Sequence, residues 1–318
     1  MESLGIWYQH NDNNEETSVD FHINLWNLYE KKKLKPFIDF GIVVNNFRSI
    51  DNISFLIPFH VEPKDIMDLF EYVKTPQVSR LIFNEEECEI ESISQYYGIR
   101  INDDRKLLLS LDNDVLQTSI RKNETVLLFK FEEIRKNDKY TNYDKLYIRF
   151  RITSNEIANA MYCPVEKQNW FLESGFVKTQ IVDIKVNKER NIPSDICQEM
   201  KRQNYSFAHF NKIHLLVMCN SNDVVDSFNN THCECRKLEI EGWNDYLDNK
   251  FDIKNVIAYH WKETRESREL SDYGKLIKIC SASTNYKLIS IYMLVVVALG
   301  TIGSLLADII MSIIGVFK

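Results

Sequence analysis

Apolar and polar residues alternate along much of the chain, which is the pattern of half-buried strands. Residues 19–25 alternate strictly, and ten further runs are rich in β-branched or aromatic residues between Asn, Asp, Ser or charged positions. We therefore expect strands at residues 19–25, 37–44, 53–59, 78–83, 106–111, 125–131, 146–152, 177–186, 213–218, 236–240 and 256–261.

Helical spacing of apolar residues is less frequent in this part of the chain. We expect short helices from Pro63 to about residue 73, from Pro193 to about Gln203, and, on weaker patterns, at 155–161 and 223–228. Because strands outnumber helices, the predicted fold class is α+β and β-rich, with sandwich-like sheets and a few helices at their edges.

Charged, weakly apolar residues at 132–144 mark the best candidate for a domain boundary. They divide the polar body into two expected β-rich subdomains, 1–135 and 140–265. Residues 262–275 are also strongly charged, and we expect them to be helical. A charged connector over 266–287 would then lead to the end of the chain.

The last thirty residues have a different character. Residues 288–307 carry no charge, and eleven of them are Leu, Ile or Val. A bilayer core of ~30 Å needs about 20 helical residues, so this stretch is long enough to span it. We expect a transmembrane segment at 288–317, crossing the membrane once. As one helix it would be ~45 Å long, so it has to tilt, protrude or bend.

Small and polar residues recur at every fourth position of this segment. Gly300, Ser304, Asp308 and Ser312 fall on one stripe of a helix, and Gly303 and Ala307 form a second pair of small residues beside it. Two interpretations stay open. The stripe is the seam of an oligomer or the lining of a pore, or Asp308 reaches the far headgroups and the residues beyond it lie along the surface.

Composition and charge indicate the cellular compartment in which we expect the body of the protein. The N-terminal residues show no secretory signal, so we expect a tail-anchored protein with its N-terminal domain in the cytoplasm. The seven cysteines form no regular framework and indicate free thiols in a reducing environment. The net charge is −7, and all of it belongs to residues 1–287, which makes direct binding of nucleic acid unlikely.

Candidate chemistry is sparse. With nine Gly in 318 residues, no Gly-rich phosphate loop occurs, nor does any common hydrolase or metalloprotease motif. Cys233 and Cys235 lie beside His232, but no second ligand pair has zinc-site spacing, so we predict no metal site. The remaining histidines are scattered. We predict neither catalytic residues nor a cofactor, although a pocket with clustered His214 or His232 would favour an enzyme.

One basic run stands out in the body: Lys31, Lys32, Lys33 and Lys35. These side chains would suit contact with anionic headgroups or phosphate. The alternative, which fits a net acidic body better, is a charged hairpin turn between two strands.

This organisation resembles the transmembrane effectors of prokaryotic anti-phage defence systems. The resemblance covers the order of a β-rich body, a charged connector and the segment 288–317 with its stripe, and it includes no shared motif. It implies a location in the bacterial inner membrane, self-association and a companion sensor protein. The sequence thus predicts a non-enzymatic effector whose helices assemble to perturb or permeabilise the bilayer. The alternative is a membrane-tethered adaptor or scaffold with a passive anchor.

Overall fold

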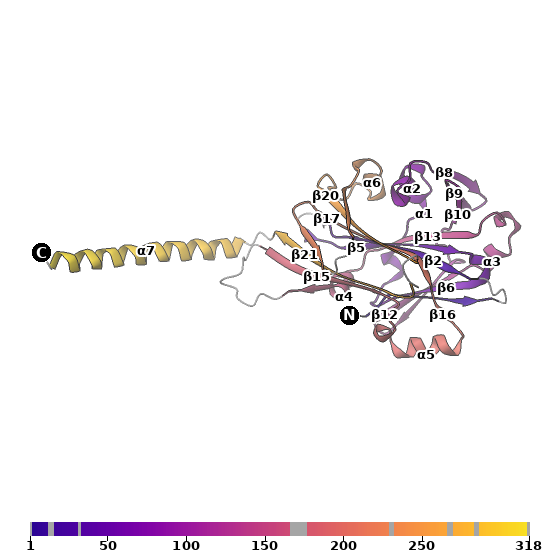
Figure 1. Cartoon of the computed structure of the whole chain (residues 1–318), viewed down its shortest axis with the longest axis horizontal. Coiled ribbons are helices and arrows are strands. Elements are labelled where there is room, and N and C mark those ends of the chain that lie inside the picture. The colour runs from indigo at the N-terminus through magenta and orange to yellow at the C-terminus, as the bar shows by residue number, and fades with distance from the viewer. Residues whose placement is uncertain are drawn as a thin grey trace.

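The computed structural model describes residues 2–11, 16–30, 33–165, 177–228, 232–265, 270–282 and 286–316. These residues form a β-rich body, from which one long helix, α7 (Tyr286–Val316), projects (Figure 1). The body is built of sandwich-like sheets with a few short helices, which confirms the predicted fold class.

The largest sheet has ten strands and runs through the whole body. In spatial order, with β7 pairing beside β13, its strands are β19 (Glu234–Lys237), β20 (Val256–Thr264), β17 (Phe210–Asn220), β2 (Ser18–Trp26), β5 (Phe37–Asn45), β13 (Lys145–Ile152), β7 (Ile66–Asp68), β10 (Asp104–Leu108), β9 (Tyr96–Ile101) and β8 (Glu89–Ile93). Two pairs are parallel, β2 with β17 and β10 with β13, and the other pairs are antiparallel.

Three smaller sheets complete the β structure. The five-stranded sheet contains, in order, β11 (Leu116–Arg121), β12 (Glu124–Lys130), β6 (Ile50–Ile57), β1 (Gly5–His10) and β16 (Ser206–Phe207). The four-stranded sheet contains β14 (Tyr162–Pro164), β15 (Val177–Val186), β21 (Tyr273–Ala282) and β18 (Val224–Ser227). A hairpin joins β3 (Tyr29–Glu30) to β4 (Lys33–Leu34).

The main core lies between the ten-stranded and five-stranded sheets. Phe21 and Phe40 from the large sheet contact Phe55 from β6, with ring centroids 5.8 and 4.8 Å apart, and all three are fully buried. Val182 and Ile277 of the four-stranded sheet belong to the same cluster. Alternate residues of each strand enter this core, as period-2 patterning requires.

Helices cover the outer faces of the sheets. α1 (Phe70–Val73), α2 (Pro76–Phe83) and α6 (Ile240–Tyr246) pack on the large sheet, and α5 (Ser194–Arg202) packs on the five-stranded sheet. Gly242, at φ +82°, lets α6 approach α2, because a Cβ there would lie 2.6 Å from Leu81 Cδ1. The connections contain α3 (Glu132–Arg135), α4 (Glu156–Met161) and 3₁₀ turns at Phe47–Ser49, Pro63–Asp65, Asp138–Tyr140 and Glu189–Asn191.

Most strand predictions and the helices after Pro193 and at 155–161 are confirmed, but 78–83 is not a strand. These residues belong to α2, which starts at Pro76 and ends at Phe83, and the next residue, Asn84, has a left-handed conformation. Proline at the first helical position and Asn just beyond the last one are helix-boundary signals. These signals outweigh the short apolar run, whose spacing fits either a strand or a helix.

Two predicted helices are also wrong. Residues 223–228 contain strand β18, which pairs with β21. The helix expected from Pro63 is divided into a 3₁₀ turn, strand β7 and the single turn α1. Strand β7 forms because Ile66–Asp68 hydrogen-bond to the edge of β13, and this pairing prevents a continuous helix.

The expected division into subdomains does not appear in the sheets. Strands from both sides of residues 135–140 form the ten-stranded sheet and share its core. The segment expected as a connector, 266–287, contains β21, which pairs with β15 over ten residues. Strand β20 continues to Thr264, so the helical prediction for 262–275 is wrong over the described residues.

Candidate functional site

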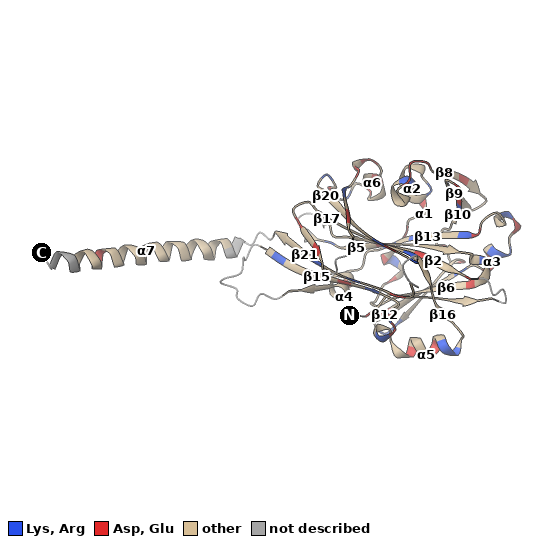
Figure 2. Ribbon diagram, viewed as in Figure 1, with Lys and Arg blue, Asp and Glu red and all other residues tan. Residues whose placement is uncertain are grey.

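Helix α7 is the first candidate site. Its segment Ile289–Ser312 has 24 residues, a mean hydropathy of 2.3 and no burial against the body, which is long and apolar enough to cross a membrane. Figure 2 shows charged residues spread over the body and a single acidic position on the described part of this helix. The chain therefore carries one C-terminal helix suited to single-pass anchoring.

The predicted stripe lies entirely on this helix. Gly300, Ser304 and Asp308 are exposed, as are Gly303, Ala307 and Ser312. A Cβ atom placed on either glycine would meet nothing within 4 Å. Each step of four residues turns the stripe by about 40° at 3.6 residues per turn, so it winds slowly around the helix. In the single chain this stripe is uncovered along its length.

The basic run after residue 30 is only partly described. Lys31, Lys32 and the side chain of Lys33 lie outside the described part of the structure. The backbone of Lys33 belongs to the β3–β4 hairpin, and Lys35 is exposed just after it. A hairpin between two strands is the second of the two interpretations offered by the sequence.

A polar groove on the outer face of the ten-stranded sheet is a second candidate site. Its volume is about 750 Å³, within the ~300–1,000 Å³ of small-molecule sites. Strands β2, β17 and β20 provide its floor. The end of α2 and the turn between β9 and β10 line it, as do α6 and β19.

Three histidines meet on the floor of this groove. They are His22 on β2, His214 on β17 and His260 on β20, three neighbouring strands. The rings of His22 and His214 lie 4.8 Å apart, and His214 Nδ1 lies 3.0 Å from His260 Nε2. Glu234 Oε2 on the edge strand is 3.7 Å from His260 Nδ1. A contiguous row of imidazoles thus leads to a carboxylate.

All three imidazoles have pKa values below the usual ~6.5. Burial lowers the pKa of His22 well below that value, and it lowers the pKa of His214 to about 3, assisted by His260 and Lys262. The pKa of His260 is also lowered by burial, although Glu234 opposes the shift. The rings are therefore neutral at pH 7, and each can donate one hydrogen bond and accept another.

Cationic side chains lie around the histidines. Lys212 and Lys262 come from β17 and β20 and are exposed. Lys106 is buried and pairs with Asp104 at 2.5 Å, and Lys145 pairs with the same carboxylate at 2.7 Å. The Asp104 carboxylate at this end of the groove is therefore already neutralised by two lysines.

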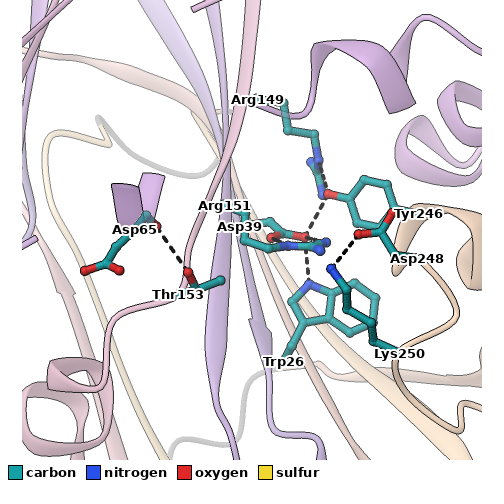
Figure 3. A network of polar contacts seen from close by, with 9 residues as sticks. All are labelled: Trp26, Asp39, Asp65, Arg149, Arg151, Thr153, Tyr246, Asp248 and Lys250. Atoms are coloured by element: carbon teal, nitrogen blue, oxygen red, sulfur yellow. Dashed lines mark hydrogen bonds and ion pairs between the residues drawn. The ribbon is translucent and has the colours of Figure 1, made fainter. Parts of the chain in front are cut away.

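A buried charge network lies next to the groove (Figure 3). Asp39 accepts hydrogen bonds from Arg151 at 2.6 and 3.1 Å, from Trp26 Nε1 at 2.8 Å and from the Tyr246 hydroxyl at 2.7 Å. The same hydroxyl accepts one from Arg149 Nε at 2.8 Å. Arg151 thus pairs directly with Asp39, whereas Arg149 is linked to it only through the Tyr246 hydroxyl, so two buried guanidinium groups lie beside one carboxylate.

A smaller cavity of about 220 Å³ lies between the five-stranded sheet and α5. Its charged residues, Arg121 and Glu199, are paired to each other through two contacts of 2.5 and 3.1 Å. Because these charges already satisfy one another, the histidine groove is the stronger candidate for ligand binding.

No protein-family model matches the chain, and no curated protein matches its sequence. Function has to follow from the chemistry of these sites. Among the described residues, no three His, Cys, Asp or Glu side chains are arranged as metal ligands.

The sequence interpretation missed the histidine groove. A signal was present, because polar residues occupy alternate positions in strands whose other positions are apolar. Asp20, His22 and Asn24 follow this spacing on β2, as do Lys212 and His214 on β17. Such a run predicts a polar outer face, but the pairing of the strands is needed to bring the histidines together.

Proposed function

We propose that this protein is a non-enzymatic, single-span membrane effector of anti-phage defence. Its β-rich body would lie on the cytoplasmic side of a bacterial inner membrane and receive a signal from a companion protein. Helix α7 would then associate with copies of itself and perturb or permeabilise the bilayer. The observation that carries this proposal is the uncovered stripe of Gly300, Ser304 and Asp308 on an exposed apolar helix.

The cost of burying charge supports this interpretation. An Asp near the centre of a membrane helix costs about 2.5–3.5 kcal/mol on insertion scales. Asp308 lies inside the candidate span Ile289–Ser312, and the small residues one and two turns before it permit close helix approach. Association through this stripe would turn the carboxylate toward other helices or water and away from lipid.

The edge of the body nearest α7 supports membrane attachment. Val177 pairs with Ala282 and Val224 pairs with Cys280, at the end of β21 that precedes the helix. Val177 is 39% exposed and Val224 is 64% exposed. Apolar side chains left in contact with solvent beside a membrane helix suit a surface that rests against the bilayer.

The alternative function is a membrane-tethered adaptor with a passive anchor. It is favoured by the position of Asp308 only four residues before Ser312, the end of the candidate span. Residues 289–307 alone cover ~28 Å as a helix. Asp308 would then lie at the far headgroups, and the helix would have no need for partners.

Substitutions in the stripe test the effector proposal. We expect Asp308→Leu and Gly300→Leu to leave membrane insertion intact and to abolish dye leakage from liposomes and toxicity on expression. Ala298→Leu is the matched control, since it introduces the same side chain about 160° around the helix from Gly300. Leakage and toxicity unchanged in both stripe variants would refute the effector proposal.

Exchange of the anchor separates the two functions. Residues 288–317 would be replaced by an unrelated single-span anchor of equal length. An effector would lose its membrane activity, whereas an adaptor would keep its cellular function. Protection of cells against phage in the exchanged variant would therefore favour the adaptor.

A further inference from the structure

The groove contains two buried polar atoms that have no hydrogen-bond partner among the described residues. These are the side-chain oxygen of Asn24, on β2, and the indole nitrogen of Trp243, on α6. Both residues line the groove, and they are 4% and 2% exposed. Buried donors and acceptors are nearly always satisfied, so an unpaired acceptor and an unpaired donor that line one groove indicate a bound polar partner.

The groove also offers nitrogen groups for a polar ligand. The neutral rings of His214 and His260 share one hydrogen bond, and the second nitrogen of His260 faces Glu234, so the second nitrogen of His214 is the one that this pair leaves for a ligand. Lys262 on β20 lies opposite His214 on β17, and Lys212 lies on β17 two residues before His214. The ammonium groups of Lys212 and Lys262 and the Trp243 indole line the same groove as N–H donors, which suits anionic oxygens.

Electrostatics favour an anion at the floor. Arg151 pairs with the carboxylate of Asp39, whereas Arg149 reaches that carboxylate only through the Tyr246 hydroxyl. Arg149 lies opposite Gly41, which in turn lies opposite His22, and its Nη2 atom has no hydrogen-bond partner among the described residues. A buried cation on β13, two strands from His22 on β2, raises the electrostatic potential at the histidine row.

The acids in the groove do not cancel this effect. Asp104 is paired with both Lys106 and Lys145. Glu234 lies 3.7 Å from the neutral His260 at the edge strand, and its side chain is 71% exposed, so water screens its charge. Asp20 lies opposite Lys212; burial raises the pKa of this carboxyl, and the nearby Lys212 opposes the shift. The remaining acids of the lining, Glu85 and Asp103, are exposed at the rim, where water screens them.

We propose that the groove is a binding site for a small organic anion whose carboxylate or phosphate group is held by Lys212, Lys262 and the His214 row. A polar donor elsewhere on the same ligand would pair with Asn24, and an acceptor would pair with Trp243. This site is independent of the membrane activity proposed above. Binding by detergent-solubilised protein and leakage from liposomes therefore fail or succeed separately.

Titration of the full-length protein in detergent tests the site. The probes are inorganic phosphate and malonate, each compared with sodium chloride at equal ionic strength, and the readouts are the thermal midpoint and the shifts of the histidine ring protons by NMR. We expect a saturable rise of the midpoint with at least one anion, together with shifts of His214 and His260. The stronger probe identifies the anionic group as phosphate or carboxylate.

Variants locate the binding. The double variant Lys212→Ala/Lys262→Ala removes two exposed lysines and is expected to weaken anion binding about tenfold or more. Lys130→Ala is the matched control, because it removes an exposed strand lysine from the opposite sheet. If both anions shift the thermal midpoint no more than sodium chloride does, the proposal is overturned. Unchanged anion affinity in the double variant overturns it as well. Trp243→Phe, which keeps the packing but loses the donor, is expected to weaken binding of the preferred anion as well.

Discussion

The two faces of the ten-stranded sheet use the same strands for opposite purposes. On β5, Phe40 points into the core against Phe55, and its neighbours Asp39 and Gly41 point outward. The inner face is a continuous apolar surface, whereas the outer face carries an ion network and a groove lined by histidines. Alternation at every second residue is therefore enough to separate the part that stabilises the body from the part that can bind.

The two faces also differ in how well they tolerate substitution of their side chains. Apolar packing tolerates exchange of one side chain for another of similar volume. A buried ion network tolerates none, because removal of one member leaves the others charged or unpaired. We expect variants of the outer face to be the more damaging, and the following measurements test this in order of expected effect.

Asp39→Leu is expected to have the largest effect, a loss of about 3–5 kcal/mol in the free energy of unfolding. It leaves the Arg151 guanidinium, the Trp26 indole and the Tyr246 hydroxyl without their acceptor. Chemical denaturation of the full chain in detergent, followed by circular dichroism, measures it. Asp183→Leu is the control: its partner Lys185 is partly exposed, so the loss should stay below about 1 kcal/mol. Equal losses in the two variants would contradict the contrast.

Acid is expected to destabilise the body through its histidines. Because their pKa values are lowered in the folded state, the unfolded state binds more protons below pH ~6.5, and stability falls as the pH falls. Between pH 7.5 and 5.5 we expect His22 and His214 to contribute a loss of about 1 kcal/mol each. The urea midpoint at the two pH values measures this, and His22→Asn/His214→Asn should flatten the difference. If the pH dependence of stability is unchanged in that double variant, groups other than His22 and His214 cause the loss at acid pH.

Gly41→Ala is expected to cost about 1–3 kcal/mol. Its Cβ would lie 3.0 Å from the Tyr147 hydroxyl, 3.1 Å from Arg149 Nη1 and 3.2 Å from His22 Cβ. Gly274→Ala is the control, since its new methyl group would meet only the flexible end of Lys188. Thermal unfolding compares the two, and equal midpoints would show that the ion network can shift to accommodate a methyl group.

Phe40→Leu is expected to have the smallest effect, a loss of about 1 kcal/mol, although Phe40 is fully buried. It places the same residue type next to the position changed in Asp39→Leu, so the two variants compare the faces directly. Denaturation under the same conditions measures both. A Phe40→Leu loss as large as that of Asp39→Leu would mean that the inner face is just as intolerant.

The sequence predicted the membrane helix and most strands because both depend on local patterns. It misassigned 78–83, where a run of six apolar and polar residues fits either a strand or a helical turn. The β-rich class followed from many such runs together, so a few wrong assignments did not change it. Strand order and the shared core depend on pairing between distant residues, which no local pattern specifies.

The histidine groove could not be predicted from the sequence for the same reason. His22, His214 and His260 lie in three separate predicted strands, and only the sheet order makes them neighbours. The ion network left a clearer trace, since Asp39, Arg149 and Arg151 stand inside strongly apolar strands where a charge needs a partner. Charges within otherwise buried strands therefore indicate the outer face, although they do not name the partner.

The parallel pairing of β2 with β17 has a consequence for the order of folding. Ser18 and Asn211, which hydrogen-bond across this pair, are 193 positions apart. Closing so long a loop is entropically costly, and sheets with such distant contacts fold slowly. Until residues 210–220 arrive, β2 has an open edge that can pair with other chains. The centre of the sheet thus stays incomplete until about two thirds of the chain has been made, and its open edge is exposed to aggregation during that time.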